Sequence, residues 1–368
     1  MLMLRVAATY QAIRIGLDGF WIGVIGGGFA VLPAIVGLHL GGVIERLGEA
    51  PSFILGGGLT LAAALMFLLL GDAPFGLVLA SVTLGLGQFI CAVTEQSAIG
   101  RLYEGFDRDA AFGYLTVAIS LAHAIGPMIV WLYGRGMLIP DTHELFVAGV
   151  VLSVPLLVIG AVTRPPGHHY EATGHSFLGT LQALVGTPGF LISSLAALAI
   201  FAAMDLLAIY LPLYGSERGI EAGVIAILLS IRAVASVISR LMFRRLLNWF
   251  GRGSLLVAAM LLAGASIGLF PASDAPIVMA SLMFAAGLGL GIGAPLTLSW
   301  VSEIAPSGMR ARALSLRLAI NRVGQAGLPV MVGVAAASVG AAGVLVGTSS
   351  ALAATAAISA WHFKIRSN

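Results

Sequence analysis

Long apolar stretches follow one another through almost the whole chain, and they constrain its fold more than any other feature. We count eleven of them, at residues 20–43, 52–70, 75–98, 110–133, 145–162, 189–211, 223–243, 254–270, 277–301, 313–336 and 341–361. A helix needs about 20 apolar residues to cross a bilayer core about 30 Å thick, whereas a membrane β-strand needs about ten residues of alternating polarity. The sequence therefore predicts an all-α membrane protein with eleven complete transmembrane helices.

The composition agrees with a membrane protein and leaves little room for a soluble domain. The chain is 59% hydrophobic and 10% charged, against about 45–50% and about 25% for a soluble domain. Its one cysteine, Cys91, lies inside an apolar stretch, so no intrachain disulfide can form. Residues 289–294 match a dinucleotide-binding fingerprint in form, but they lie inside an apolar stretch with no strand before it. We expect no bound cofactor, no metal site and no nucleic-acid partner.

The basic residues are distributed unevenly between the two sides of the membrane. By the order of the stretches, twelve of the 19 Lys and Arg residues are assigned to one side, among them Arg240 at the end of the stretch at 223–243, and three lie deeper inside stretches. Four fall on the other side, namely Arg5, Arg14, Arg135 and Arg218. Because cytoplasmic loops carry an excess of Lys and Arg, the twelve-residue side and the C-terminus are predicted to be cytoplasmic. We expect an integral protein of a bacterial-type plasma (inner) membrane.

The two halves of the chain repeat one another at an offset of about 202 residues. The offset places Gly85, Gly87, Arg108 and Pro127 on Gly287, Gly289, Arg310 and Pro329. Secondary transporters are commonly built from such repeats. We therefore predict a transmembrane bundle at 1–162, a cytoplasmic linker at 163–188 and a second bundle at 189–368. Three histidines in the linker, His168, His169 and His175, fit a solvated segment better than a metal site.

The repeat also indicates an incomplete first helix. The counterpart of the stretch at 189–211 begins before Met1 at this offset. Residues 1–15 are therefore predicted to be the outer end of a first helix whose cytoplasmic half is absent. A truncated chain or a misassigned start codon would explain this. With that helix restored, each half contains six helices.

A short charged motif follows the first complete stretch. Gly41, Glu45, Arg46 and Gly48 are spaced as in the Gly-x-x-x-Asp-Arg-x-Gly signature of the major facilitator superfamily of transporters, which the motif resembles with Glu in place of Asp. The resemblance implies that Glu45 caps a neighbouring helix N-terminus and latches one conformation, since a carboxylate is stabilised at the positive end of a helix dipole. A tight charged turn is the alternative.

A second motif lies in the stretch at 110–133. Gly113, Ala122, Gly126 and Pro127 are spaced like the Gly-x8-Gly-x3-Gly-Pro motif of the antiporter branch of that superfamily, which they resemble with Ala122 in place of Gly. Small residues let helices approach closely and proline bends a helix, and both properties suit a moving interface. The arginine that this branch carries in helix 4 is absent, because the aligned position is near Ser81.

The resemblance covers nearly the whole chain after residue 15 and implies two six-helix bundles around a central cavity. It also implies that helices 3, 6, 9 and 12 face lipid and that the others line the cavity. Five charged residues fall within cavity helices: Glu95, Asp205, Arg232, Arg317 and Arg322. A charge at the bilayer centre costs about 2.5–3.5 kcal/mol on insertion scales, so these residues indicate a substrate or proton pathway.

The depth of these charges in the membrane suggests different roles. Asp205 and Arg232 lie near the middle of adjacent antiparallel stretches, where an ion pair between them is expected. Asp205 is then either a proton carrier or a structural partner that stays ionised. Glu95 and Arg317 lie near the cytoplasmic ends of their stretches, where their side chains are expected to extend to the membrane surface.

Arg322 lies at mid-depth and has no obvious acid of its own in the sequence. Since a guanidinium suits a carboxylate or phosphate, we expect Arg322 to bind an anionic group of the substrate. Asn321 and Gln325 share one helical face, where they bind either substrate or neighbouring helices. His123 aligns with Gln325 in the repeat and is either a packing residue or a group that titrates near neutral pH.

The sequence therefore predicts a secondary active transporter that exports a small organic solute by alternating access, coupled to protons. Uptake of an organic anion is the alternative within transport, and a non-transporting membrane sensor or assembly subunit is the alternative from another class. An enzyme is not expected, because His39, His123 and Cys91 are scattered over three stretches. The expected partners are the solute, protons and the lipid bilayer, and the chain is expected to act as a monomer.

Overall fold

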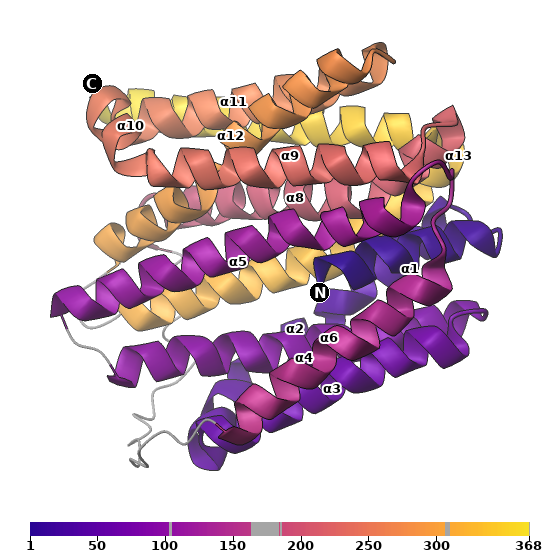
Figure 1. The fold of residues 1–368 in the computed structure, drawn as a ribbon. Helices are drawn as coiled ribbons and strands as arrows, with labels where there is room; N and C mark the ends of the chain where they lie inside the picture. The colour runs from indigo at the N-terminus through magenta and orange to yellow at the C-terminus, as the bar shows by residue number, and fades with distance from the viewer. Residues whose placement is uncertain (103–104, 163–183, 185, 306–309, 368) are drawn as a thin grey trace.

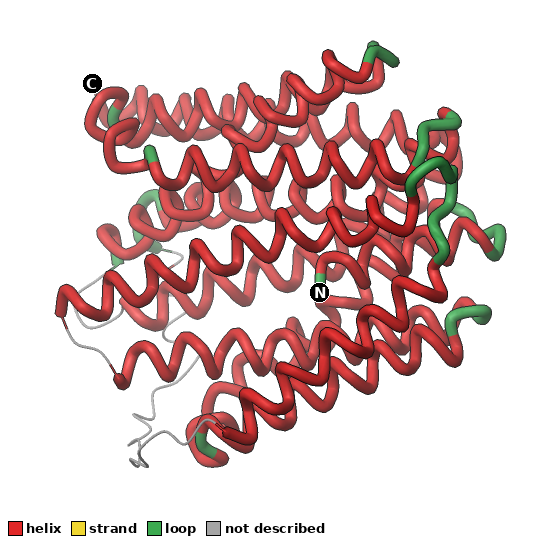
Figure 2. Tube along the Cα trace, viewed as in Figure 1, coloured by secondary structure: helices red, strands yellow, loops and turns green. Residues whose placement is uncertain are grey.

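A computed structural model describes residues 1–102, 105–162, 184, 186–305 and 310–367. Within these ranges the backbone forms helices joined by short turns, with no β-strand (Figure 1, Figure 2). The helices lie alongside one another in a bundle. Most helices of the first half, indigo to magenta, lie on the lower side of the view, and most helices of the second half, orange to yellow, lie on the upper side (Figure 1). The predicted all-α architecture is confirmed.

The helices follow the apolar stretches along the chain. In the first half they are α1 (Leu2–Arg14), α2 (Gly19–Leu47), α3 (Glu49–Leu70), α4 (Pro74–Leu102), α5 (Gly105–Gly134) and α6 (Thr142–Val162). In the second half they are α8 (Phe190–Arg218), α9 (Ala222–Leu241), α10 (Phe243–Phe250), α11 (Arg252–Leu269), the 3-10 helix η1 (Phe270–Ala272), α12 (Pro276–Ile304) and α13 (Arg310–Ser367).

Ten of the described helices are long and apolar enough to cross a membrane. The last of them, α13, has 58 residues and a non-helical backbone at Gly340, with φ 67° and ψ 179°. It therefore contains two helical segments, and with α13 counted as two the helices match the eleven predicted spans. Helix α1 has 13 residues, so at 1.5 Å per residue it is about 20 Å long and shorter than a span.

Two short elements, α10 and η1, were not predicted. They have 8 and 3 residues, which is too short for a hydrophobic period to be recognised in the sequence. Helix α10 connects α9 to α11 and has no buried residue. Its Arg244, Arg245 and Trp249 side chains are exposed.

Glycines at the helix ends repeat between the two halves. Gly48, between α2 and α3, has φ 82° and ψ 171°, and Gly251, between α10 and α11, has φ 71° and ψ 166°. The two positions are 203 residues apart, close to the offset predicted from the sequence. Two further pairs of positive-φ glycines have nearly the same separation, namely Gly16 with Gly219 and Gly136 with Gly340. A β-carbon disfavours this backbone region, so each of these corners calls for glycine.

Glycines inside the helices let the backbones of neighbouring helices touch within each half. A Cβ on Gly85 of α4 would lie 1.6 Å from the backbone oxygen of Phe29 on α2. A Cβ on Gly287 of α12 would lie 2.2 Å from the backbone oxygen of Arg232 on α9. The two contacts are equivalent at the repeat offset. Small residues allow this close approach, on which helix association in a bilayer depends.

The two halves are joined at the end of the bundle that carries the turns between α1 and α2, between α5 and α6, and between α8 and α9 (Figure 2). We call it the closed end. The Tyr210 hydroxyl of α8 donates to the backbone oxygens of Gly19 on α2 (3.3 Å) and Pro329 on α13 (3.0 Å). The Ala222 backbone NH donates to the Met137 carbonyl over 2.8 Å. These bonds hold α2 and the α5–α6 turn against the second half.

Candidate functional site

A buried ion pair links the two halves. Nη1 of Arg5 on α1 donates to Oδ1 of Asp205 on α8 over 2.7 Å, and each side chain is 14% exposed. The guanidinium of Arg5 also lies over the Phe29 ring of α2, with 4.3 Å between its Cζ atom and the ring centre. The pair therefore connects α1 and α2 in the first half to α8 in the second.

This ion pair corrects two expectations from the sequence. Arg5, which was assigned to the outer side, is largely buried between the two halves, and Arg232 is not the ion-pair partner of Asp205. The expected pairing is wrong because consecutive helices were assumed to be close neighbours. In the structure, α9, which carries Arg232, packs mainly on α5 and α12, whereas α8 packs on α1, α12 and α13. Arg232 still interacts with Asp205 electrostatically.

Arg322 makes two contacts that hold its guanidinium. Its Nη1 donates to Oε1 of Gln325 over 3.2 Å, and its Cζ atom lies 5.3 Å from the centre of the Phe89 ring on α4. Neighbouring Asn321 is buried, and its Oδ1 has no hydrogen-bond partner among the described residues. A role of Arg322, Asn321 and Gln325 in binding substrate stays a prediction.

Arg317 lies inside the bundle, which corrects the expectation that it extends to the membrane surface. The residue is 2% exposed. Its Nη2 donates to Oγ1 of Thr297 on α12 over 2.6 Å, and its Cζ atom lies 5.8 Å from the centre of the Phe201 ring on α8. An acceptor and a ring within reach keep this side chain inside. Glu95 on α4 is partly exposed.

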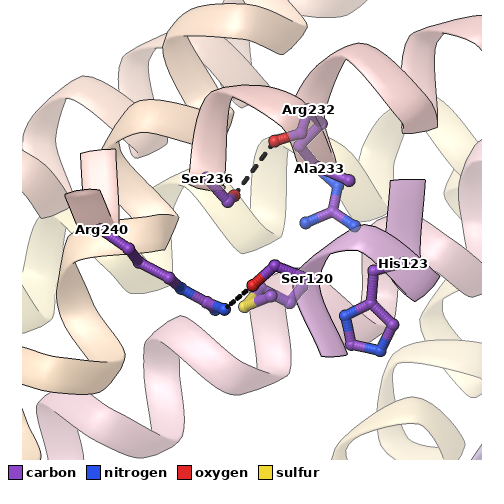
Figure 3. A pocket seen from close by; sticks show the side chains of 7 residues that line it. Ser120, His123, Arg232, Ala233, Ser236 and Arg240 are labelled. Carbon is purple, nitrogen blue, oxygen red and sulfur yellow. Dashed lines mark hydrogen bonds between the residues drawn. The ribbon is translucent and has the colours of Figure 1, made fainter. Parts of the chain in front are cut away.

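A pocket lies between α5, α8 and α9 (Figure 3). It contains ≈ 220 Å³ of space free of atoms, including space open to solvent. Its lining residues are Ser120, His123, Met204, Arg232, Ala233, Ser236 and Arg240. Arg240 spans from α9 to α5, because its Nη1 donates to the Ser120 hydroxyl over 2.6 Å. Its Nε donates to the Gly291 carbonyl on α12 over 3.3 Å. The pocket is therefore built from both halves of the chain.

Arg232 is the most deeply buried charge of this pocket. It is 3% exposed, and its Nε and Nη1 have no hydrogen-bond partner among the described residues. Its guanidinium points away from the α9 backbone into the space between α9 and α5, on the side where His123 lies (Figure 3). The Ser236 hydroxyl donates to the backbone oxygens of Arg232 (3.0 Å) and Gly287 (2.9 Å). Arg232 thus presents unused hydrogen-bond donors to the pocket.

The charges at the interface of the two halves are mainly positive in the described part of the chain. Asp205 is paired with Arg5 and interacts electrostatically with Arg232 and Arg322. Arg240 adds a fourth guanidinium beside the pocket. One acid among four arginines leaves a positive potential, which attracts anions.

The latch motif predicted from the sequence is described only in part. The backbone of Gly41, Glu45 and Arg46 continues α2, whereas the side chains of Glu45 and Arg46 lie outside the described part of the structure. Gly48 forms the turn between α2 and α3. The capping role of Glu45 therefore stays a prediction. The linker predicted at 163–188 also stays a prediction, because most of it, including its three histidines, lies outside the described ranges.

The antiporter-like motif lies along α5. Gly113 lies within α5, Ala122 is exposed and Pro127 is buried within the helix. Gly126 lies against α1, because a Cβ there would be 3.3 Å from the backbone nitrogen of Met3. In the described part of the motif, a small residue thus allows the contact between α5 and the helix that carries Arg5.

Sequence reasoning missed several residues of this site. Ser120 and Tyr210 carry no charge and give no signal within an apolar stretch. Arg240 was counted with the cytoplasmic residues, but its side chain extends from α9 to α5. Among the described residues, no group of three or more His, Cys, Asp or Glu is placed to hold a metal ion.

The fold and the site together define a class of protein: a helical membrane protein with internal duplication and charged residues buried between its two halves. A family model described as Major Facilitator Superfamily matches residues 3–329 and 194–367. The chain belongs to this family. Membership identifies it as a membrane transporter rather than an enzyme, and the antiporter branch is not distinguished from the rest.

Several solved structures share the fold. The nucleoside transporter NupG superposes with a TM-score of 0.77 at 14% identity, over 99% of this chain and 97% of that chain. A bacterial homolog of the human lysosomal transporter Spinster, in an inward-facing and occupied conformation, gives 0.74 at 16% identity, over 99% and 94%. A D-xylose–proton symporter gives 0.70 at 16% identity, over 97% and 96%. No curated protein sequence matches the chain significantly. Since the identities are low, the likeness concerns the fold.

Proposed function

We propose that the chain is a secondary active transporter that exports a small organic solute by alternating access, in exchange for protons. The ion pair between Arg5 and Asp205 is the observation that carries this proposal. A carboxylate that takes up a proton loses its charge and with it most of its attraction to a guanidinium. Protonation of Asp205 therefore weakens the link between α1 and α8, so that proton binding is coupled to movement of the two halves.

The moving parts in this proposal are the two bundles, residues 1–162 and 189–368, which rock about the interface as a monomer. The bonds at the closed end stabilise the present state. The short helix α10, with Arg244 and Arg245, lies at the end of the bundle that carries the C-terminus (Figure 1). The positive-inside rule assigns this end to the cytoplasm. The closed end then faces outward, in the inner membrane of a bacterial-type cell.

Different observations support two candidates for the direction of transport, namely export and uptake. Export is supported by the antiporter-like spacing in α5, where Gly126 allows contact with α1, the helix of Arg5. Uptake of an organic anion is the second candidate, and the excess of buried arginines over acids at the interface favours it. The two candidates differ in the direction of solute flux relative to proton flux.

A flux assay in proteoliposomes tests the proposal. The full chain is reconstituted, a pH difference is imposed, and a panel of labelled small organic solutes is offered. At least one solute is expected to move against its gradient only when the pH difference is present. Solute moving opposite to protons supports export, and solute moving with protons supports uptake. No flux for any solute would favour the sensor or assembly role instead.

Replacing Asp205 with Asn tests the coupling step. The variant is expected to lose proton-driven accumulation and to keep exchange of solute for solute, since its side chain cannot take up a proton. Asp274→Asn is the matched control, because Asp274 is 73% exposed in its pair with Arg218 and lies outside the interface. This control is expected to accumulate solute like the wild type. Proton-driven accumulation that persists in Asp205→Asn rejects Asp205 as the proton carrier.

A further inference from the structure

The pocket between α5, α8 and α9 has the chemical features of an oxyanion site. Arg232, Arg240 and His123 line it, and none of its lining residues is Asp or Glu. The guanidinium of Arg232 is buried, and two of its three nitrogens have no hydrogen-bond partner in the described part of the chain. Buried donors left unpaired are costly. Carboxylate and phosphate oxygens satisfy a guanidinium best, because they accept charge-assisted hydrogen bonds in its plane.

We infer that the transported solute carries a carboxylate or phosphate group, and that this pocket binds that group through Arg232. The inference rests on the proposed transport function and adds the chemical class of the solute. Arg240 contributes positive charge from a fixed position, since Ser120 and the Gly291 carbonyl hold its guanidinium. Arg232 supplies the free donors.

The other charged groups near the pocket are already engaged. Asp205 interacts electrostatically with Arg232, but its carboxylate is bonded to Arg5 at 2.7 Å. Arg322, to which the sequence assigned the anion, donates to Gln325 and lies over an aromatic ring on α4. Arg232 therefore offers two buried nitrogens without a hydrogen-bond partner to an anion that enters this pocket.

The position of the pocket connects binding to movement. Ser120 and His123 belong to α5 in the first half, whereas Arg232 and Arg240 belong to α9 in the second. An anion in the pocket contacts both halves at once, so its affinity depends on how α5 and α9 are placed relative to each other. A ligand with different affinities for two conformations shifts the equilibrium between them.

Thermal unfolding of the purified full chain tests the binding step. Sodium phosphate and sodium acetate are each compared with sodium chloride at constant ionic strength, and the response of the wild type to the two anions distinguishes a phosphate from a carboxylate site. Arg232→Met is expected to weaken binding by about 10- to 100-fold, because a charge-assisted hydrogen bond is lost. Arg232→Lys keeps the charge without the planar fork, so its anion affinity is expected to lie between those of the wild type and Arg232→Met. Arg218→Met, at an exposed site at the closed end, is the matched control.

Each outcome of this binding experiment supports or overturns the inference. Stabilisation of the wild type by phosphate or acetate that is lost in Arg232→Met and kept in Arg218→Met supports it. No anion-specific stabilisation of the wild type, or equal stabilisation of Arg232→Met, overturns it. If Arg232→Met does not elute as a single species in size-exclusion chromatography, Arg232→Lys takes its place. Weaker anion-specific stabilisation of Arg232→Lys than of the wild type supports the inference, and equal stabilisation overturns it.

A flux experiment separates this inference from the proposed function. Pairs of solutes that differ only in charge are offered to proteoliposomes: a carboxylic acid with its amide, and a phosphate monoester with its alcohol. The wild type is expected to transport the anionic member of one pair preferentially, and Arg232→Met is expected to lose the preference. Equal transport of the neutral member overturns the anionic class and leaves transport intact. Absence of all flux, with anion stabilisation preserved, rejects transport and leaves the anion pocket.

Discussion

Replacement of Gly23 with Ala is expected to open the closed end of the transporter. Gly23 lies on α2 against α13, where a Cβ would be 2.3 Å from the backbone oxygen of Pro329 and 2.8 Å from the Tyr210 hydroxyl. Ordinary contacts begin near 3.4 Å, so α2 and α13 must separate by about 1 Å to accept the methyl group. That separation also lengthens the hydrogen bonds from Tyr210, which are 3.0 and 3.3 Å long.

The size of the effect follows from the cost of the overlap. Inserting a methyl group into a well-packed interface costs about 1–3 kcal/mol. The clash exists only while the two helices are in contact, so this cost applies to the closed state and not to a state in which this end is open. The ratio of closed to open molecules is therefore expected to fall by a factor of about 5 to 150.

Distance measurements between spin labels report this equilibrium directly. Labels are attached at Phe20→Cys and Ser338→Cys, two exposed positions on the two sides of the contact, in a Cys91→Ala background. Double electron–electron resonance in nanodiscs is expected to show a longer distance gaining population in Gly23→Ala. Gly327→Ala on α13 is the matched control, because no atom lies within 4 Å of its added Cβ. An unchanged distance distribution in Gly23→Ala, or an equal shift in the control, would refute the reasoning.

Two further predictions concern the packing that supports the site. Thr297→Val removes the acceptor for the buried guanidinium of Arg317 and is expected to cost about 1–3 kcal/mol of stability, seen as a lower unfolding temperature, whereas Thr297→Ser should retain most of it. Gly85→Ala would bring a Cβ to 1.6 Å from the Phe29 carbonyl, so a large loss of folded protein is expected in size-exclusion chromatography. Gly58→Ala, whose nearest contact is 4.0 Å away, should fold like the wild type; equal yields of the two alanine variants would contradict the prediction.

The helices could be predicted because apolar length is a local property of the chain. A span is recognised from about 20 consecutive residues, whichever helices later surround it. The break at Gly340 was also visible, because the two apolar stretches on either side of it could be counted separately. Helix α10 could not be seen in the same way, since eight residues contain little more than two turns of a helix.

The partners of the buried charges could not be predicted, because they depend on which helices meet. Arg5 and Asp205 are 200 residues apart in the sequence. The residues themselves mark a site, but no local pattern states that α1 rather than α9 faces Asp205. Arg317 shows the same limit for depth: its position in the stretch suggested the membrane surface, and the Thr297 hydroxyl on α12 holds it inside.

Some residues of the pocket could be identified from the sequence, and others could not. Arg232 was identified from its charge in an apolar stretch, and His123 from its place in the repeat. Ser120 gave no signal, because serine is common in membrane helices as a packing residue. Arg240 was placed outside the membrane because the sequence shows where a residue is attached to its helix, but not where a long side chain ends.

The matched corners of the two halves give this molecule an internal reference. Gly48 and Gly251 have nearly the same backbone angles, and no atom lies within 4 Å of a Cβ built on either. Alanine at either corner therefore introduces the same local strain and no clash. Any difference between the two variants in turnover must come from the surrounding bundle. Each half of the chain can therefore serve as the control for the other.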